Sequence, residues 1–259
     1  MRGAKDVHSS PKPHGNPLTL PPTLRYNRPI IIARESEATR LKNKIITAKQ
    51  AADLLQSGDT VMFGSFLGNA CPENIIDEIL ANGTDNLTMI ANDTAFPDIG
   101  HGRLVLEKRI KTTIASHVGT NPETGKLMAT GEMEVLLTPQ GTLVEQIRAG
   151  GFGLGGVLTP TGIGTDIEIG KQKLEIDGKE YLLEKPLRAK IAYLQGAVVD
   201  TMGNVWYRGS SRNFCTLIAM AADTVVVEAE KIVQPGEIEP ENVHTACILV
   251  DYIVQGRAR

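Results

Sequence analysis

Short apolar segments alternate with helical segments along most of this chain, and this alternation constrains the fold more than any other feature of the sequence. An apolar run of four to eight residues between turn signals is typical of a buried strand. Strands that alternate with helices favour a parallel sheet whose two faces are both covered by helices. The apolar runs that predict strands lie at 59–64, 86–93, 111–116 and 133–139.

Two of the predicted helices have clear start and stop signals. Thr47 and Gln50 have the spacing of a capping box and predict a helix that runs to about Gln56. Pro72 suits the first position of a second helix, whose four apolar residues share one face before Gly83 ends it. Further segments predict a short helix over 141–151 and a helix followed by a strand over 213–230.

An antiparallel hairpin interrupts this alternation. Residues 173–186 read as two strands joined by Asp177-Gly178, a dipeptide favoured in two-residue hairpin turns. A second turn is predicted within residues 200–207. The predicted fold class is therefore α/β, with an open, mostly parallel sheet, helices on both faces and an inserted β-hairpin.

The first 43 residues differ in composition from the rest. They are rich in proline, lack periodicity and carry an excess of basic residues, so they cannot bury a core. We predict a disordered tail or a non-native extension at 1–43 and a single domain at 44–259.

Composition argues against several classes of partner. A formal net charge of −3 gives no general attraction to nucleic acid or to an anionic membrane, and no apolar run approaches the roughly 20 residues of a membrane span. Cys71, Cys215 and Cys247 have none of the spacings of a metal site or a disulfide framework. We expect reduced thiols, no metal and a cytoplasmic location.

Seven glycines lie within residues 148–165. Gly151, Gly153 and Gly156 have the spacing of a dinucleotide-binding motif, but a helix rather than a strand precedes them. A P-loop does not fit the following segment either, because five residues rather than four separate its glycines. Since glycine permits close backbone approach, we interpret this cluster as close packing near the site, with a subunit interface as a further option.

A second glycine-bearing loop, residues 63–72, joins a predicted strand to the helix that follows Pro72. Ligands of open α/β sheets bind outside the carboxyl ends of the strands. The loop amides and the following helix N-terminus could donate several hydrogen bonds to an anion. This loop is therefore a better candidate for phosphate binding than the 148–165 cluster, and an ordinary connecting loop is an equally open alternative.

Several motifs together resemble the α subunits of family I coenzyme A (CoA) transferases, in particular the bacterial acetate or butyrate:acetoacetate type. They are "SGDTVMFGSFLGNACPENIIDEIL", "IANDTAFPDIGHG", "LTPQGTLVEQIRAGG", "LTPTGIGT" and "SSRNF". The resemblance runs in order from about Lys44 to Gly256. It implies a CoA transferase-like fold, related to sugar-phosphate isomerase folds.

The resemblance also implies a ping-pong reaction in which a glutamate of the enzyme carries CoA as a thioester. In the family this glutamate lies in a Ser-Glu-Asn-Gly motif of the β half, and the motif does not occur in this chain. A separate β subunit is therefore the implied partner in a hetero-oligomer. The CoA thioester is implied as a substrate, together with short-chain acyl groups and carboxylic acids, and no tightly bound cofactor is expected.

The family motifs also imply site residues. Asn92 and Gln140 are the implied catalytic amides, which would orient the partner's glutamate and stabilise charge on oxygen. The sequence departs from the family pattern at Ser65 and Ala70, where the family has glycine. The implied CoA-binding residues are Gly64, Ser65, Phe66, Leu67, Gly68, Asn69 and Ala70.

Other polar residues have simpler interpretations. Glu145 is expected to pair with Arg148, three residues further along a helix, rather than to act as a nucleophile. His101 and His117 lack a serine or cysteine partner at a recognisable spacing and are interpreted as structural. Glu132 and Glu134 are the other carboxylates that could be taken for a nucleophile. Arg212-Asn213 is expected to cap the helix that follows it.

Two further functions are open to a chain with this fold class, because related folds serve sugar-phosphate isomerases and ligand-binding sensor domains. A regulator would need a DNA-binding element, and the proline-rich segment offers no helix-turn-helix. An isomerase would act without a partner subunit. We favour the transferase.

Overall fold

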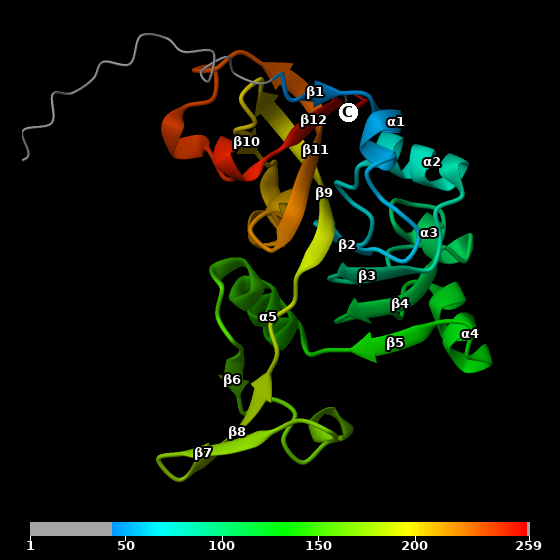
Figure 1. The fold of residues 1–259 in the computed structure, drawn as a ribbon, viewed down its shortest axis with the longest axis vertical. Helices are drawn as coiled ribbons and strands as arrows, with labels where there is room; N and C mark the ends of the chain where they lie inside the picture. The colour runs from blue at the N-terminus through cyan, green and yellow to red at the C-terminus, as the bar shows by residue number, and fades with distance from the viewer. Residues whose placement is uncertain (1–42, 258–259) are drawn as a thin grey trace, which may run out of the picture. The chain divides into compact units, whose positions relative to one another are not determined.

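The protein is built on a nine-stranded sheet, described by a computed structural model for residues 43–257 (Figure 1). Eight strands run parallel in the order β1-β12-β11-β9-β2-β3-β4-β5, so the predicted open, mostly parallel sheet is confirmed. The predicted tail at 1–43 lies outside the described residues apart from Asn43. The parallel strands are β1 (Ile45–Ile46), β2 (Thr60–Phe63), β3 (Leu87–Ala91), β4 (Ile110–Ala115), β5 (Glu134–Leu137), β9 (Ala189–Asp200), β11 (Ala222–Val233) and β12 (Tyr252–Gln255).

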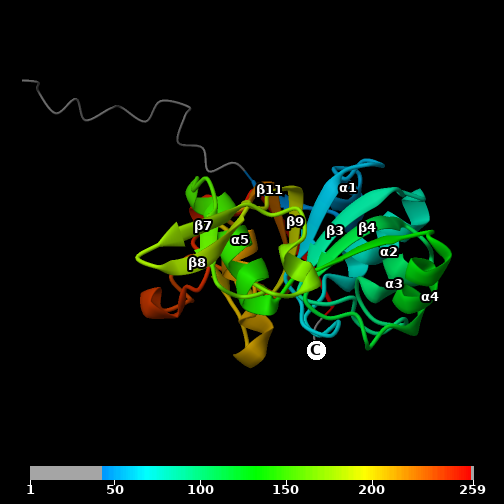
Figure 2. The same ribbon diagram turned by 90° about the horizontal axis from the view of Figure 1, so that it is seen from below.

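Helices cover both faces of this sheet, as predicted (Figure 2). The alternation of side chains along β2 divides the core: Val61 and Phe63 belong to the apolar cluster on one face, and Met62 to the cluster on the other. Within residues 43–257, no helix has both the length and the apolar character that a membrane span needs. The helices are α1 (Ala48–Ala52), α2 (Glu73–Asn82), α3 (Gly102–Leu106) and α4 (Pro122–Thr130) on the first face, and α5 (Gln140–Phe152) and α6 (Cys215–Ile218) on the second.

Helices α1 and α2 begin at the predicted residues or next to them, but the exact bounds of both helices differ slightly from the predicted ones. Thr47 and Gln50 form the expected capping box, but α1 ends at Ala52 rather than near Gln56. Pro72 is the N-cap of α2 and not its first helical residue, and Gly83 ends the helix in the left-handed conformation. Pro72 therefore precedes the helix that it was predicted to begin.

Two helices were not predicted. The start of α4 carries both expected signals, because Asn121 accepts a hydrogen bond from the Glu123 amide and Pro122 occupies the first turn. Gly131 closes it in the left-handed conformation. The other helix, α3, is only five residues long, and its N-cap residue makes no side-chain cap. A helix this short leaves almost no periodic signal in the sequence.

The glycine cluster serves close packing at its start and left-handed turns further on. Helix α5 runs through Phe152, so Gly150 and Gly151 are helical. A Cβ atom at Gly150 would lie 1.9 Å from the Leu187 carbonyl oxygen, and one at Gly151 would lie 2.8 Å from Cβ of Met220. The predicted close packing is therefore confirmed for these two glycines.

The predicted hairpin is present in a separate small sheet of three antiparallel strands, whose order is β6-β8-β7. Asp177 and Gly178 both have positive φ, as the favoured type I′ hairpin turn requires. The second predicted turn joins β9 to the antiparallel β10 (Val205–Trp206). The small sheet consists of β6 (Val157–Thr159), β7 (Lys173–Ile176) and β8 (Lys179–Glu184).

The order of the main sheet creates a switch point at β2. From β2 the chain proceeds through β3, β4 and β5 in one direction, and then returns to place β9, β11 and β12 on the other side of β2. Open α/β sheets bind ligands outside the carboxyl ends of the strands at such a point. The loop at 64–71 leaves the carboxyl end of β2 at this position.

Candidate functional site

The implied catalytic and CoA-binding residues lie at the carboxyl edge of the main sheet. Asn92 directly follows β3, and Gln140 begins α5 three residues after the end of β5. The loop Gly64–Ala70 follows β2. Because these strands are parallel, their carboxyl ends share one edge of the sheet.

The two predicted amides are in contact. Gln140 Nε2 donates a hydrogen bond to Asn92 Oδ1 over 3.0 Å, and Ser116 Oγ donates to the same oxygen over 2.8 Å. The Asn92 oxygen is therefore fixed by donors that follow β4 and β5. Because both contacts are made to the oxygen, they also fix the direction in which the Nδ2 group of Asn92 points.

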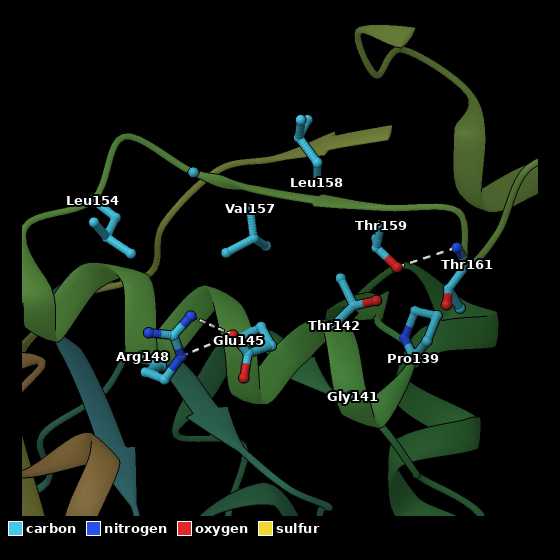
Figure 3. A pocket seen from close by; sticks show the side chains of 11 residues that line it. Pro139, Gly141, Thr142, Glu145, Arg148, Leu154, Val157, Leu158, Thr159 and Thr161 are labelled. Atoms are coloured by element: carbon cyan, nitrogen blue, oxygen red, sulfur yellow. Dashed lines mark hydrogen bonds and ion pairs between the residues drawn. The ribbon is translucent and has the colours of Figure 1, made fainter. Parts of the chain in front are cut away.

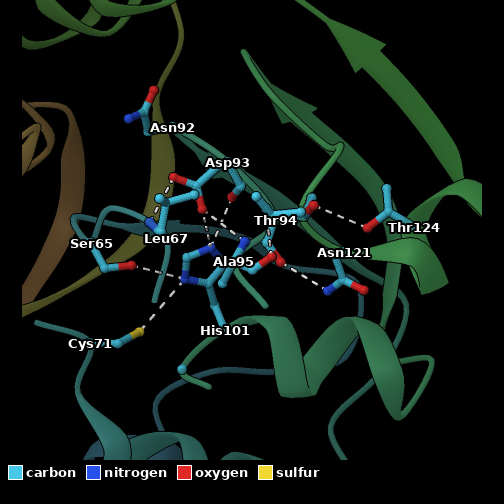
Figure 4. A network of polar contacts seen from close by, with 12 residues as sticks. Ser65, Leu67, Cys71, Asn92, Asp93, Thr94, Ala95, His101, Asn121 and Thr124 are labelled. Carbon is cyan, nitrogen blue, oxygen red and sulfur yellow. Dashed lines mark hydrogen bonds and ion pairs between the residues drawn. The ribbon is translucent and has the colours of Figure 1, made fainter. Parts of the chain in front are cut away.

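The Asn92 amide nitrogen has no such partner. Asn92 is 2% exposed, yet no hydrogen bond among residues 43–257 uses its Nδ2 group. Figure 4 shows its side chain directed away from the buried cluster around Asp93. A preorganised amide whose N–H groups are unused can donate to an oxygen on which charge develops.

The loop Gly64–Ala70 forms a tight turn at its tip. The amide of Asn69 donates to the Phe66 carbonyl over 2.9 Å, and Leu67 and Gly68 between them have φ values of 53° and 78°. Two consecutive positive φ values define a type I′ turn. Phe66 and Asn69 are exposed at this tip, while Gly64 and Gly68 are buried.

The two departures from the family glycines have different consequences. Ala70 has a φ of 54°, a left-handed conformation that costs an L-residue about 1–2 kcal/mol relative to the right-handed one. Ser65 is not among the residues with positive φ; its hydroxyl lies 3.0 Å from Nδ1 of His101. Ala70 therefore strains the loop, whereas the Ser65 side chain adds a hydrogen bond.

Two amides at the N-terminus of α2 are already occupied, which weakens the sequence-based argument for phosphate binding there. The Glu228 carboxylate of β11 accepts hydrogen bonds from the amides of Asn74 and Ile75, over 3.3 and 3.0 Å. Burial raises the pKa of Glu228 to about 7. An internal side chain, which sequence spacing could not reveal, already occupies this anion-binding position.

His101 belongs to a buried cluster with Ser65, Asp93 and Cys71 (Figure 4). Its Nδ1 lies 3.0 Å from Ser65 Oγ and 3.6 Å from Cys71 Sγ, and its Nε2 lies 2.8 Å from the Asp93 carbonyl oxygen. Burial lowers the pKa of His101, so the ring is neutral at pH 7; Nε2–H donates to Asp93, and Nδ1 accepts from Ser65.

This cluster superficially resembles a Ser-His-Asp triad, but its geometry does not suit hydrolysis. Ser65 is 1% exposed, so its hydroxyl cannot reach a substrate. Burial raises the pKa of the Cys71 thiol far above its ordinary value, which leaves no thiolate nucleophile either. The structural interpretation of His101 therefore fits the observed contacts.

The remaining candidates make surface contacts. Arg148 Nη2 lies 2.7 Å from Glu145, as predicted. Glu132 pairs with Lys108 over 2.7 Å, and Glu134 accepts a hydrogen bond from Thr112. The described residues contain no group of three or more His, Cys, Asp or Glu side chains able to hold a metal ion.

Asn213 has a different role from the one predicted. The N-cap residue of α6 is Phe214, and no side chain caps this helix. Asn213 Nδ2 instead donates to the Ser65 carbonyl oxygen over 2.9 Å. A residue 148 positions away in the sequence therefore supports the loop after β2, a long-range contact that no local pattern could predict.

A cavity of about 550 Å³ lies between the outer face of α5 and strand β6 (Figure 3). Threonine hydroxyls, apolar side chains and the Glu145–Arg148 pair line it. Asn92, Gln140 and the loop Gly64–Ala70 are not among its lining residues. The cavity is therefore separate from the predicted site, although Pro139 and Gly141 of its lining flank Gln140.

The fold and the polar side chains at the carboxyl edge place this chain in the class of open α/β proteins, which typically bind ligands at that edge. A sequence model of the family described as Coenzyme A transferase matches residues 45–256, and the chain belongs to this family. The predicted resemblance is thus confirmed, and the sensor and isomerase alternatives are not favoured.

Two relatives align along nearly their whole length. The chain is 50% identical over 214 residues to the acetate CoA-transferase subunit alpha of Escherichia coli, which covers 83% of this chain and 97% of the relative. It is 48% identical over 215 residues to the acetoacetyl-CoA:acetate/butyrate CoA transferase alpha subunit of Clostridium acetobutylicum, covering 83% and 99%. The crystal structure of glutaconate coenzyme A-transferase from Acidaminococcus fermentans has the same fold, with a TM-score of 0.74, 20% identity and coverage of 83% and 76%.

Proposed function

We propose that this chain is the α subunit of a heteromeric family I CoA transferase that moves CoA between a short-chain acyl-CoA, such as acetyl-CoA or butyryl-CoA, and a carboxylic acid such as acetoacetate. The names of the two relatives that align along nearly their whole length support this substrate class. Residues 44–259 would form the α domain, working in the cytoplasm with a separate β subunit.

The nucleophile in this proposal belongs to the β subunit. Its glutamate carboxylate attacks the thioester carbonyl and expels CoA thiolate, which leaves an acyl-glutamyl anhydride. The thiolate then attacks the glutamyl carbonyl, expels the acyl group as a free carboxylate and forms a glutamyl-CoA thioester. The acceptor carboxylate reverses these two steps. Splitting the exchange into covalent steps lowers each barrier.

Asn92 and Gln140 would orient this glutamate and stabilise the oxygen that gains charge during attack. One observation carries the proposal. Gln140 and Ser116 hold the side-chain oxygen of the buried Asn92, and the N–H groups of the same side chain make no hydrogen bond among residues 43–257. A donor that is preorganised in this way needs no reorganisation when charge develops. The Asn92 amide is then available to the incoming carboxylate at the carboxyl edge of the sheet.

The loop Gly64–Ala70 would bind CoA. Phe66 and Asn69 at its exposed tip are the side chains that a nucleotide or pantetheine group could contact. Backbone amides of the loop would supply donors, because Glu228 occupies the amides of Asn74 and Ile75 at the start of α2. No tightly bound cofactor is required by this chemistry, since CoA enters and leaves as part of the substrates.

Purification with and without the product of the neighbouring open reading frame tests the function. CoA transfer from acetyl-CoA to acetoacetate is expected only in the mixed sample. A sugar-phosphate isomerase activity of this chain alone would contradict the proposal, and so would a covalent CoA adduct on a side chain of the isolated chain.

A further inference from the structure

The turn at the tip of the loop is held by a residue that neither the motifs nor the amide pair identified. Asp93 is fully buried, and its two carboxylate oxygens accept hydrogen bonds from two backbone amides. Oδ2 accepts from the amide of Leu67 over 2.9 Å, and Oδ1 accepts from the amide of Ala95 over 2.8 Å. A single carboxylate thus joins the loop after β2 to the loop after β3.

Both amides belong to residues in an unfavourable conformation. Leu67 has a φ of 53° and Ala95 a φ of 54°, a region that residues with a Cβ atom seldom adopt. Hydrogen bonds to an ionised group are stronger than neutral ones. The Asp93 carboxylate therefore offsets the cost of holding Leu67 in the left-handed conformation that the turn needs.

A second contact joins the same segments. His101 donates from Nε2 to the Asp93 carbonyl oxygen and accepts at Nδ1 from the Ser65 hydroxyl. The loop is thus attached to the end of β3 at Ser65 and at Leu67. Asn92 is the residue before Asp93, so the attachment also sets the loop relative to the predicted catalytic amide.

We propose that Asp93 is a positioning residue for CoA binding, because its carboxylate fixes the Phe66–Asn69 turn in the conformation that receives CoA and holds it beside Asn92. This inference rests on the proposed function. It assigns Asp93 no contact with substrate, and its effect passes through the backbone of Leu67.

Asp93→Asn tests the proposal in the complex of this chain with its β subunit. An amide has one acceptor oxygen, so one of the two backbone donors loses its partner. We expect the KM for acyl-CoA to rise at least tenfold, while the KM for the acceptor acid stays within twofold. Asp200→Asn is the matched control, because Asp200 is also buried and accepts from three backbone amides in the β9–β10 turn.

A second substitution separates positioning from general destabilisation. Glycine adopts positive φ without strain. Leu67→Gly in the Asp93→Asn background should therefore lower the KM for acyl-CoA at least threefold, although it restores no side-chain contact. An equal rise of both KM values, the same change in Asp200→Asn, or a double variant no better than Asp93→Asn would overturn the inference.

Hydrogen exchange in the wild-type complex gives a test that does not depend on how the variants fold. The Leu67 amide should exchange slowly, as a donor to a buried carboxylate. Exchange at the rate of an open loop would overturn the proposal. An inactive wild-type complex would instead contradict the proposed function, so the two failures are distinguishable.

Discussion

At the scale of single residues, the contact between Asn92 and Gln140 leads to a direct prediction. Gln140→Ala should lower kcat by about a hundredfold, a loss typical of removing one donor that stabilises a charged oxygen, without affecting assembly. Gln140 is exposed and belongs to neither apolar cluster of the core, and Ser116 still holds the Asn92 oxygen, so the free energy of unfolding should hardly change. Steady-state kinetics of the complex, with size-exclusion chromatography, provide the measurement.

Gln172→Ala is the control for this substitution, because Gln172 is also exposed and lies outside the site. Unchanged steady-state rates in Gln140→Ala would remove Gln140 from the mechanism. An equal loss of rate in Gln140→Ala and Gln172→Ala would show that the effect is not specific to the site.

The strain at Ala70 gives a second prediction. Ala70→Gly should raise the free energy of unfolding by about 0.5–1 kcal/mol, because relief of the left-handed conformation exceeds the entropy that glycine adds to the unfolded chain. Ala51→Gly in helix α1 should instead destabilise the protein by about 1 kcal/mol. Chemical denaturation measures both, and a destabilised Ala70→Gly would show that the loop relies on the buried methyl group.

The family motifs identified the amide pair, because Asn92 and Gln140 each lie within three residues of a strand end in the sequence. They did not identify Asp93, although it stands beside Asn92 at the same strand end. The roles of Asp93, Glu228 and Asn213 depend on backbone groups 26, 153 and 148 residues away. Contacts of this separation are set by the order of the strands, which local spacing does not encode.

At the scale of secondary structure elements, the two kinds of helical glycine give opposite predictions. Gly150→Ala should destabilise the protein by about 1–3 kcal/mol, because its Cβ atom would lie 1.9 Å from the Leu187 carbonyl oxygen, a backbone atom. Gly125→Ala in helix α4 should stabilise it by about 0.5–1 kcal/mol, since no atom lies within 4 Å of its Cβ position. Thermal unfolding of both variants is the measurement, and equal shifts would contradict the assigned role of the glycine cluster.

The elements themselves could be predicted wherever a local signal was strong. The capping box of α1, the apolar run of β2 and the Asp177-Gly178 hairpin all appear as expected. Helix α4 was not predicted, although Asn121-Pro122 and Gly131 are local signals for its two ends. Strand β1, only two residues long, owes its existence to pairing with β12 and has no signal of its own.

At the scale of the whole molecule, alternation along the chain predicted a parallel sheet but not its order. The insertion of β9 beside β2 brings together segments more than 120 residues apart, with Val61 paired to Ile191. This neighbour creates the switch point at which the loop after β2 lies. Propensity and periodicity describe single elements, whereas the choice of neighbours follows from burial of both sheet faces at once.

The junction of β11 and α2 makes the stability of the whole molecule depend on pH. Burial raises the pKa of Glu228 from 4.5 to about 7, so the folded state holds this proton more tightly than the unfolded state does. The stabilisation from this group is complete below pH 4.5 and is lost as the pH rises towards 7. His101 acts in the opposite sense: its lowered pKa contributes stability above its ordinary value of 6.5, which is lost in acid.

Glu228→Gln isolates the first of these terms. The variant cannot take up this proton, but it keeps one acceptor for the α2 amides. Only the opposite contribution of His101 then remains. The free energy of unfolding of the variant should therefore fall more steeply than that of the wild type as the pH drops from 7 to 4.5. The difference between wild type and variant should grow over this range by up to about 3 kcal/mol. Urea denaturation at pH 5, 6, 7 and 8 measures it. A difference that stays constant with pH would mean that Glu228 has an ordinary pKa, and that the start of α2 is held by a carboxylate ionised throughout this range.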